Sequence, residues 1–328
     1  MNKLFKFLSG LTASLLLMQP VYAAGESLSS HPAIPYICCI ILLLVLVFLS
    51  FELVRARGKI KNSSLTEEDW LLVQKINKGF ETDEFKMYLQ FIVDNKTKKI
   101  VSAEALSRWE PANGEVILPG RYIPLMEKTG LIAKLDYHMF ELACKKLSTW
   151  KDSVFSDYTI SCNFTRITIS DENFVEIIKN IADKYDFDRK KLLIEITEDS
   201  VEKNMKVAVG NITEVKNLGF RIASDDIGSG YTSLMSMCGH PYPIDVIKLD
   251  REILLLTDDS KGQKLFLGII SLAHNLDLQV VCEGVETEEQ NSLVTQSNCD
   301  YIQGWYYSKA LPEDVAEGFA RDYMKSFS

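Results

Sequence analysis

From residue 86 onward, short runs rich in β-branched and aromatic residues alternate with longer stretches whose apolar residues recur every three or four positions. The first pattern predicts β-strands and the second predicts amphipathic helices. Strands are predicted at 86–93, 99–109, 158–165, 191–197, 220–225, 244–249, 278–283 and 300–303. Helices are predicted at 134–150, 172–185, 203–218, 261–276 and 286–297, and a Ser64 to Glu67 capping box starts another near Thr66. About eight units predict an α/β fold closed into a (β/α)8 barrel. A doubly wound open sheet is the alternative, although no Gly-x-Gly-x-x-Gly opens the first helix.

Side-chain parity within the predicted strands separates an apolar face from a polar one. In 158–165 the apolar residues Tyr158, Ile160, Cys162 and Phe164 alternate with polar ones, so Asn163 is expected to face the barrel axis. The same rule turns six further polar side chains inward: Glu104, Arg108, Glu195, Lys248, Glu283 and Gln303. Each lies near the carboxyl end of its strand, which is the end where barrel enzymes build their active sites.

Asp225 and Asp226 bring the acids expected at this rim to five. Carboxylates this close raise one another's pKa unless cations accompany them, and hard oxygen ligands suit Mg²⁺ or Mn²⁺. Two such ions could activate water and stabilise the leaving oxygen of a phosphodiester, with Lys248 and Arg108 orienting the phosphate or the water. Neighbouring residues of a strand point to opposite faces, so both aspartates can serve only at a strand end or a bend. The structural alternatives are solvated acids, a plain turn after Asp226, and a Lys248 that merely neutralises Asp250.

Two apolar stretches precede the barrel. Residues 1–23 resemble a secretory signal, and 24–35 form a short segment without Lys or Arg. Residues 36–54 are apolar apart from Ser50 and Glu52, and the stretch is long enough for a transmembrane helix. The basic tether 55–64 marks the cytoplasmic side, so the body at 65–325 is expected in the cytoplasm. The chain is therefore predicted to be a single-pass inner-membrane protein, or a two-pass protein if the signal is not cleaved.

Charge is unevenly distributed over the 328 residues. Residues 1–61 carry a net charge of +4, and residues 62–328 carry −13. An acidic body repels nucleic-acid backbones, so binding to DNA or RNA is not expected, whereas a small anionic substrate remains possible beside metal ions. The seven cysteines are scattered without metal-ligand spacing, which favours buried free thiols in a reduced compartment.

At this point the motifs resemble those of the EAL-domain phosphodiesterases, bacterial enzymes that hydrolyse cyclic di-GMP. Glu104-Ala-Leu-Ser-Arg108 carries the signature, and the order and spacing of the other motifs fit over about residues 65–325. Those motifs are Cys-Asn163-Phe-Thr, Glu195-Ile-Thr-Glu198, Asp225-Asp226-Ile-Gly-Ser-Gly-Tyr231, Ile-Lys248-Leu-Asp250, Glu283-Gly-Val-Glu286 and Gln303-Gly304.

The resemblance implies a modified TIM barrel that binds two Mg²⁺ or Mn²⁺ ions and releases the linear dinucleotide pGpG. It implies the metal ligands Glu104, Asn163, Glu195, Asp225 and Asp226. Lys248 would position or deprotonate the attacking water, and Glu283 would complete the metal and water network. Arg108, Gln303 and Gln90 would hold the substrate. Glu198 and Glu286 would anchor the loop 226–233, which in the family links the metal site to a homodimer interface.

Departures from the family pattern are mild. Phe91 stands where the family usually has proline, Ile227 and Ser229 replace Phe and Thr, and Thr165 replaces serine. None removes a ligand, and no cyclase signature occurs. Two other functions stay open: a membrane receptor that binds cyclic di-GMP without cutting it, and a metal hydrolase for another phosphodiester.

Overall fold

The computed structural model describes residues 65–112, 114–197, 205–227 and 242–326. The chain divides into two units, Met1–Thr66 and Glu67–Ser328, and the second is the folded body. The predicted signal, the segment 24–35 expected on the periplasmic side, the membrane span and the tether lie outside the described residues, as do Glu198 and most of the loop 226–233. No helix in the described part of the chain is long and apolar enough to span a membrane.

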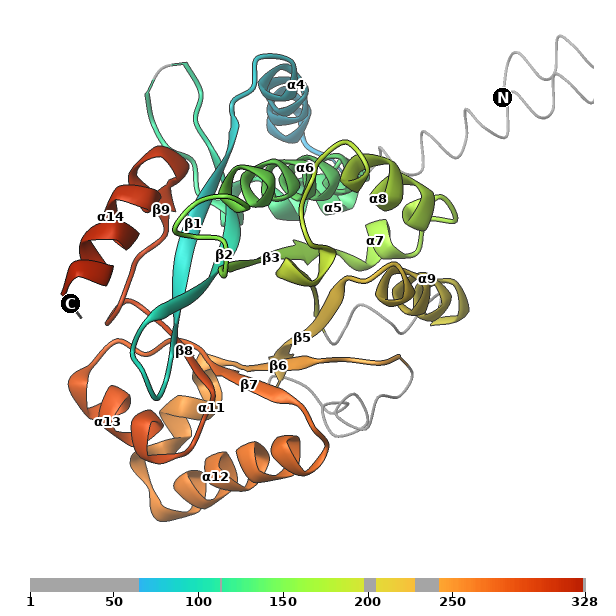
Figure 1. The fold of residues 1–328 in the computed structure, drawn as a ribbon. Helices are drawn as coiled ribbons and strands as arrows, with labels where there is room; N and C mark the ends of the chain where they lie inside the picture. Colours follow the sequence, from blue (N-terminus) through green and yellow to red (C-terminus); the bar gives the residue numbers. More distant parts are fainter. Residues whose placement is uncertain (1–64, 113, 198–204, 228–241, 327–328) are drawn as a thin grey trace, which may run out of the picture. The chain divides into compact units, whose positions relative to one another are not determined.

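The body is built on a closed barrel (Figure 1). Its strands run in the order β2-β3-β4-β5-β6-β7-β8-β1, and β1 closes the ring by pairing with β2 as well as with β8. The bounds are β1 Phe85–Asp94, β2 Ile100–Trp109, β3 Thr159–Phe164, β4 Leu192–Thr197, β5 Arg221–Ile227, β6 Val246–Leu249, β7 Gln279–Cys282 and β8 Tyr301–Gln303. A short β9, Leu311–Pro312, pairs with β1 at Tyr88 and Leu89. The predicted barrel is confirmed, and the predicted strands agree with these bounds to within two residues.

One strand departs from a regular (β/α)8 barrel. β2 to β8 pair in parallel, whereas β1 is antiparallel to both of its neighbours. The reason is local: a tight turn joins β1 to β2, leaving no room for a crossover helix. Asp94 Oδ1 stabilises this turn by accepting from the backbone N–H of Lys96 and of Thr97, at 3.1 and 2.7 Å. Lys98 then takes the left-handed conformation, at φ 58°.

Helices surround the barrel (Figure 1). They are α4 Glu67–Glu81, α5 Ile123–Thr129, α6 Ile132–Trp150, α7 Arg166–Ile169, α8 Phe174–Ala182, α9 Met205–Asn217, α11 Arg251–Leu255, α12 Ser260–Asn275, α13 Glu288–Gln296 and α14 Glu313–Lys325, with short 3-10 turns at Pro119–Arg121, Arg189–Lys191 and Leu256–Asp258. The five predicted helices correspond to α6, α8, α9, α12 and α13. Helix α14 was not predicted; it covers β1, where its Phe319 stacks on Phe91 at 5.7 Å between ring centroids.

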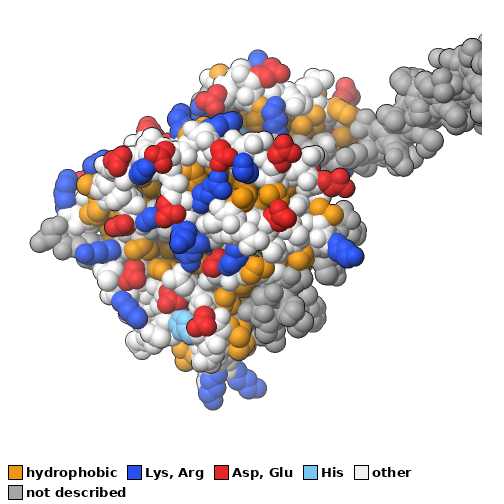
Figure 2. All heavy atoms as spheres, turned by 45° about the vertical axis from the view of Figure 1, so that its right-hand side comes forward, with side chains coloured by type: hydrophobic (Ala, Val, Ile, Leu, Met, Phe, Trp, Pro, Cys, Tyr) orange, Lys and Arg blue, Asp and Glu red, His pale blue; other side chains and the backbone are white. Residues whose placement is uncertain are grey.

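The described strands alternate inward and outward side chains as the sequence predicts. On β2 the outward side chains Ala103, Ala105 and Trp109 are at most 4% exposed and pack beneath the helices. The inward Glu104 lies level with Ser161 of β3, and Asn163 lies level with Glu195 of β4. The polar side chains thus enter the barrel at similar heights. Over the face shown in Figure 2, acidic and basic side chains are interspersed.

Candidate active site

Lys248 lies at the centre of the inward-facing acids. Its ammonium is 3.2 Å from Glu104 Oε2, 3.0 Å from Glu195 Oε2, 3.4 Å from Asp225 Oδ1 and 2.7 Å from Glu283 Oε1. The Lys248 side chain is only 2% exposed. The four acids come from β2, β4, β5 and the end of β7, so one cation ties together strands from around the ring.

The suggestion that Lys248 merely neutralises Asp250 is wrong. Asp250 follows β6 and caps helix α11, where its carboxylate accepts from the backbone N–H of Glu252 at 2.6 Å. In a continuing strand Lys248 and Asp250 would share a face, but β6 ends at Leu249 and Asp250 is the N-cap of α11, so alternation does not extend to it. Lys248 therefore belongs to the inner cluster.

Glu104 connects the two sides of this cluster. Its Oε1 accepts from Asn163 Nδ2 at 2.7 Å, and its Oε2 accepts from Gln303 Nε2 at 2.7 Å and from Lys248. Burial raises the pKa of Glu104, but Lys248 and the hydrogen bonds from Gln303 and Asn163 outweigh it and hold that pKa below its usual range. Glu104 is thus a buried carboxylate that stays ionised.

Three other acids have raised pKa values. Burial, reinforced by the neighbouring carboxylates, raises the pKa of Glu195 well above its ordinary value even beside Lys248. The same causes raise the pKa of Glu283 to about 8, and burial with the charge of Asp225 raises the pKa of Asp226 to about 6. For Lys248, burial favours the neutral amine, yet the surrounding acids raise its pKa well above its usual range. One lysine is therefore too little positive charge for this set of acids at neutral pH.

The bend required at the paired aspartates is present. Asp226 has φ 56°, in the left-handed region, and the pairing of β5 with β6 shifts register between Ser224 and Ile227. Such a bulge re-aims one side chain of a strand. In a regular strand, Asp225 and Asp226 would point to opposite faces. The bulge removes that constraint.

Arg108 and Gln90 lie farther along the rim. The Arg108 guanidinium is half-buried, lies 5.5 Å from the centre of the Tyr88 ring and donates to the carbonyl of Ser107 at 2.8 Å. Gln90 lies opposite Glu104 in the pairing of β1 with β2, and its Nε2 donates to the carbonyl of Ser308 at 3.2 Å. Their roles toward a substrate stay predictions.

Tyr88 is a rim residue that the sequence reasoning missed. Its hydroxyl donates to Glu110 Oε1 at 2.8 Å, which fixes the ring under the Arg108 guanidinium. Parity could have found it, because Tyr88 shares a face of β1 with Gln90. Glu286, predicted as a loop anchor, pairs with Arg251 at 2.8 Å. Most of the loop that it was predicted to anchor, and Glu198, lie outside the described residues, so that prediction remains untested.

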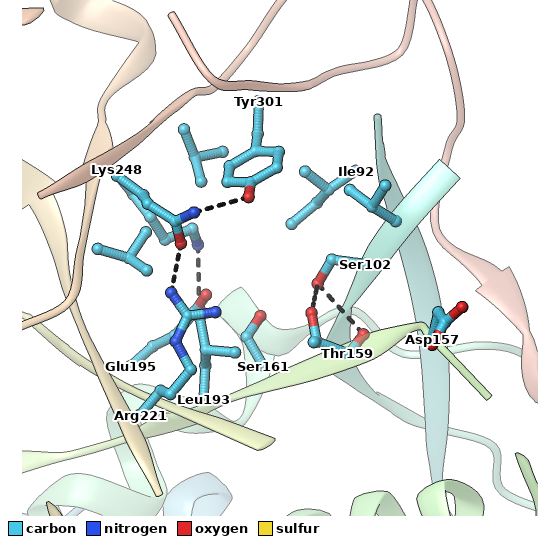
Figure 3. Close-up of a pocket in the computed structure, with 14 residues that line it drawn as sticks. Ile92, Ser102, Asp157, Thr159, Ser161, Leu193, Glu195, Arg221, Lys248 and Tyr301 are labelled. Atoms are coloured by element: carbon cyan, nitrogen blue, oxygen red, sulfur yellow. Dashed lines mark hydrogen bonds and ion pairs between the residues drawn. The ribbon is translucent and has the colours of Figure 1, made fainter. Parts of the chain in front are cut away.

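Beneath the acids the barrel is hollow. A cavity of about 160 Å³ has Glu195 and Lys248 in its wall, with apolar side chains such as Ile92 and Leu193 around it (Figure 3). At its other end Gln279 accepts from Arg221 and donates to the Tyr301 hydroxyl. The Ser161 hydroxyl lines the cavity, is buried, and has no hydrogen-bond partner among the described residues. A polar cavity of this size suits ordered water.

The donor set fits divalent cations by its chemistry. It offers carboxylate and amide oxygens only, and the raised pKa values of Glu195, Asp226 and Glu283 show a shortage of positive charge. Gln303 Oε1 is also buried and, within the described chain, has no hydrogen-bond partner. In the described residues no three His, Cys, Asp or Glu side chains are arranged around one common ion position. The Lys248 ammonium lies between the acids instead.

A closed α/β barrel with buried acids and a lysine at the carboxyl rim is the class that the fold and the site define. Residues 73–310 match the EAL domain, so this chain belongs to the EAL domain family. It is 27% identical over 249 residues to MucR of Pseudomonas aeruginosa, described as a bifunctional diguanylate cyclase/cyclic di-GMP phosphodiesterase; the match covers 76% of this chain and 36% of MucR. It is 30% identical over 248 residues to the signaling protein YkoW of Bacillus subtilis, covering 74% and 30%.

Solved structures show the same relationship. The MucR phosphodiesterase in complex with c-di-GMP is 28% identical, with a TM-score of 0.69 and coverage of 75% of this chain and 99% of that one. The EAL enzyme Bd1971, with cAMP and cyclic-di-GMP bound, is 25% identical, with a TM-score of 0.71 and coverage of 87% and 76%. The chain spans about a third of the length of MucR and YkoW. The predicted family is thereby confirmed.

Proposed function

We propose that this chain is a metal-dependent phosphodiesterase that hydrolyses cyclic di-GMP to linear pGpG at the carboxyl rim of its barrel. The observation that carries the proposal is the cluster of oxygen ligands around Lys248, where Glu104, Glu195 and Asp225 pair with its ammonium and Asn163 donates to Glu104. The MucR and Bd1971 structures, which hold cyclic di-GMP, support the choice of substrate.

Two Mg²⁺ or Mn²⁺ ions would be held by Glu104, Asn163, Glu195, Asp225 and Asp226. When bound, such ions supply a water of lowered pKa and neutralise charge on the phosphodiester. The raised carboxylate pKa values indicate that the cluster lacks positive charge, and the two ions would supply it. Each carboxylate ligand must be ionised to bind, so binding is expected to displace protons.

Lys248 and Glu283 would handle the attacking water. With acids on every side, Lys248 keeps its proton, so in this arrangement it donates hydrogen bonds and orients the water. Taking a proton from that water would require part of the surrounding negative charge to be neutralised first. Arg108 is suited to a phosphate oxygen by its permanent charge, and Gln303 and Gln90 would contribute amide contacts.

A receptor that binds cyclic di-GMP without cutting it is the second candidate. The observation that favours it is the position of Lys248, which already pairs with four acids. The purified full-length chain should be incubated with cyclic di-GMP and Mn²⁺, and the products separated by chromatography. We expect pGpG, its loss with a chelator and its return with Mg²⁺. Binding without pGpG would select the receptor, and cleavage of other diesters in a substrate panel would select a different hydrolase.

We further propose that the chain is anchored in the inner membrane by residues 36–54, with its barrel in the cytoplasm and paired as a homodimer. The support for the anchor is the apolar run and the four Lys and Arg residues that follow it, whereas the homodimer is proposed from the family resemblance alone. Reporter fusions after residue 30 and after residue 328 would test the orientation. A cytoplasmic signal from the first fusion would overturn this orientation, because residues 24–35 lie on the periplasmic side whether the signal segment is cleaved or retained.

A further inference from the structure

Asp136 is a buried carboxylate outside the rim cluster. It lies on α6, is 6% exposed, and accepts three hydrogen bonds on the single oxygen Oδ2. The donors are the backbone N–H of Thr165 at 3.0 Å, the Thr165 hydroxyl at 2.8 Å and the Thr168 hydroxyl at 2.5 Å. Thr165 is the residue that follows β3 and begins α7. The carboxylate thus fastens the turn at the end of β3 to helix α6.

Stability alone does not account for this arrangement. Among the described residues, Asp136 takes part in no ion pair, and burial raises its pKa to about 6 against the opposing effect of the hydrogen bonds from Thr168 and Thr165. A buried charge without a cation is expensive, and a well-packed apolar residue usually gives a more stable contact. The carboxylate therefore serves the geometry of the turn.

The same helix also holds the residue before Thr165. Phe164 points outward from β3, and its ring lies 5.7 Å from that of Phe140 and 6.4 Å from that of Tyr137, both on α6. Asn163 precedes Phe164 and points inward, where its amide donates to Glu104 Oε1 at 2.7 Å. Helix α6 thus fixes the two residues that immediately follow Asn163.

We infer that Asp136 is a positioning residue for Asn163, setting the depth at which the Asn163 amide enters the barrel and hence its fit to a divalent ion. This inference rests on the proposed role of Asn163 as a metal ligand. Asp136 touches neither Asn163 nor the rim directly; it acts through the backbone of Thr165. Partners that orient metal ligands in this way typically contribute about 10- to 100-fold to metal affinity.

The test is Mn²⁺ binding to the purified full-length chain without nucleotide. Binding is measured from the electron paramagnetic resonance signal of the Mn²⁺ that stays free. Thr168→Val removes one donor without changing size and should weaken binding roughly 10-fold. Asp136→Leu should weaken it further, whereas Asp136→Asn keeps an oxygen acceptor and should restore binding to within about 3-fold of the parent. In hydrolysis assays the half-saturating Mn²⁺ concentration should rise while KM for cyclic di-GMP stays unchanged.

Thr257→Val is the matched control, because the Thr257 hydroxyl is buried and donates to the carbonyl of Leu254 at 2.6 Å, remote from the turn after β3. It should leave Mn²⁺ affinity unchanged. Equal affinities in Thr168→Val, Thr257→Val and the parent would overturn the inference while leaving the hydrolase intact. A parent chain that binds no Mn²⁺ would overturn both. If Asp136→Leu fails to fold, Thr168→Val and Asp136→Asn decide the question.

Discussion

The Lys248 ammonium and the Glu195 carboxylate form an ion pair of 3.0 Å inside the barrel, where their side chains are 2% and 1% exposed. A buried pair is worth keeping only when its surroundings satisfy both charges. Here they do so for Lys248, which has three further acids, but not for Glu195, whose pKa is raised by burial and by those same acids. Lys248 alone therefore does not neutralise the surrounding acids, and additional cations would do so.

Replacing Glu195 by Gln should abolish turnover and preserve the fold. The raised pKa of Glu195 means that a neutral side chain is tolerated here without bound metal, so the circular dichroism spectrum and Tm should change little. Loss of an ionised ligand should lower kcat/KM by at least about 100-fold, the upper end of what partners of metal ligands contribute. Glu176→Gln on α8 is the surface control. Full activity in Glu195→Gln with metal still required would reject Glu195 as a ligand.

Replacing Lys248 by Met should destabilise the protein by roughly 3–5 kcal/mol at pH 7.5, because four acids lose their common cation. Without Lys248 the pKa values of Glu195 and Glu283 would rise further in the folded state, so this loss is largest at high pH and shrinks as these acids take up protons below their folded pKa. Urea unfolding at pH 7.5 and at pH 5.5 measures both effects. Lys216→Met, which breaks the partly exposed pair with Asp245, should cost no more than about 1 kcal/mol.

A Lys248→Met variant as stable as the parent at pH 7.5 would show that the acids are already protonated or solvated. A Lys216→Met variant that loses as much stability as Lys248→Met would show that the effect is not specific to the rim. Added Mn²⁺ should stabilise Lys248→Met, since a divalent ion can replace the lost charge.

Replacing Gly304 by Ala should disturb the rim through Gln303. A Cβ on Gly304 would lie 2.0 Å from the carbonyl oxygen of Val285, so the backbone after β8 must move. Overpacking of this kind costs about 1–3 kcal/mol and would pull the Gln303 amide away from Glu104. We expect lower Tm and a higher KM. Gly268→Ala on α12 is the control, because nothing lies within 4 Å of its new Cβ, and it should stabilise the helix by about 1 kcal/mol.

The rim could be predicted from sequence because alternation in a strand is a local property. Asn163, Glu195 and Lys248 are each flanked by apolar neighbours on a short buried strand, so their inward direction follows from parity alone. The need for a bend at Asp225 and Asp226 followed from the same rule, and the register shift of β5 meets it.

Strand alternation could not predict which residues of different strands are in contact. The four acids around Lys248 are separated by up to 179 residues, from Glu104 to Glu283, and only the closed ring brings them together. The antiparallel β1 also escaped prediction, because the turn that causes it depends on Asp94 bonding backbone groups two and three residues later. Asp136 gave no signal either, since a lone acid on an amphipathic helix resembles a solvated one.

Asp136 provides a test of pH dependence that is independent of metal. Its pKa of about 6 in the folded state exceeds the value of about 3.9 expected in the unfolded chain, because of burial and the charge of Glu127. The folded state therefore binds more protons between these values, and the Asp136 contribution to stability falls as pH rises from about 4 to 6, by up to about 3 kcal/mol. The Asp136→Asn variant has no ionisable group at this position, so its stability lacks this pH-dependent contribution. Its Tm relative to the parent should thus be higher at pH 7.5 than at pH 4.5, as measured by calorimetry at both values. A difference that does not change with pH would mean that Asp136 has the same pKa in the folded and the unfolded chain, so that its carboxylate is solvated in the folded protein.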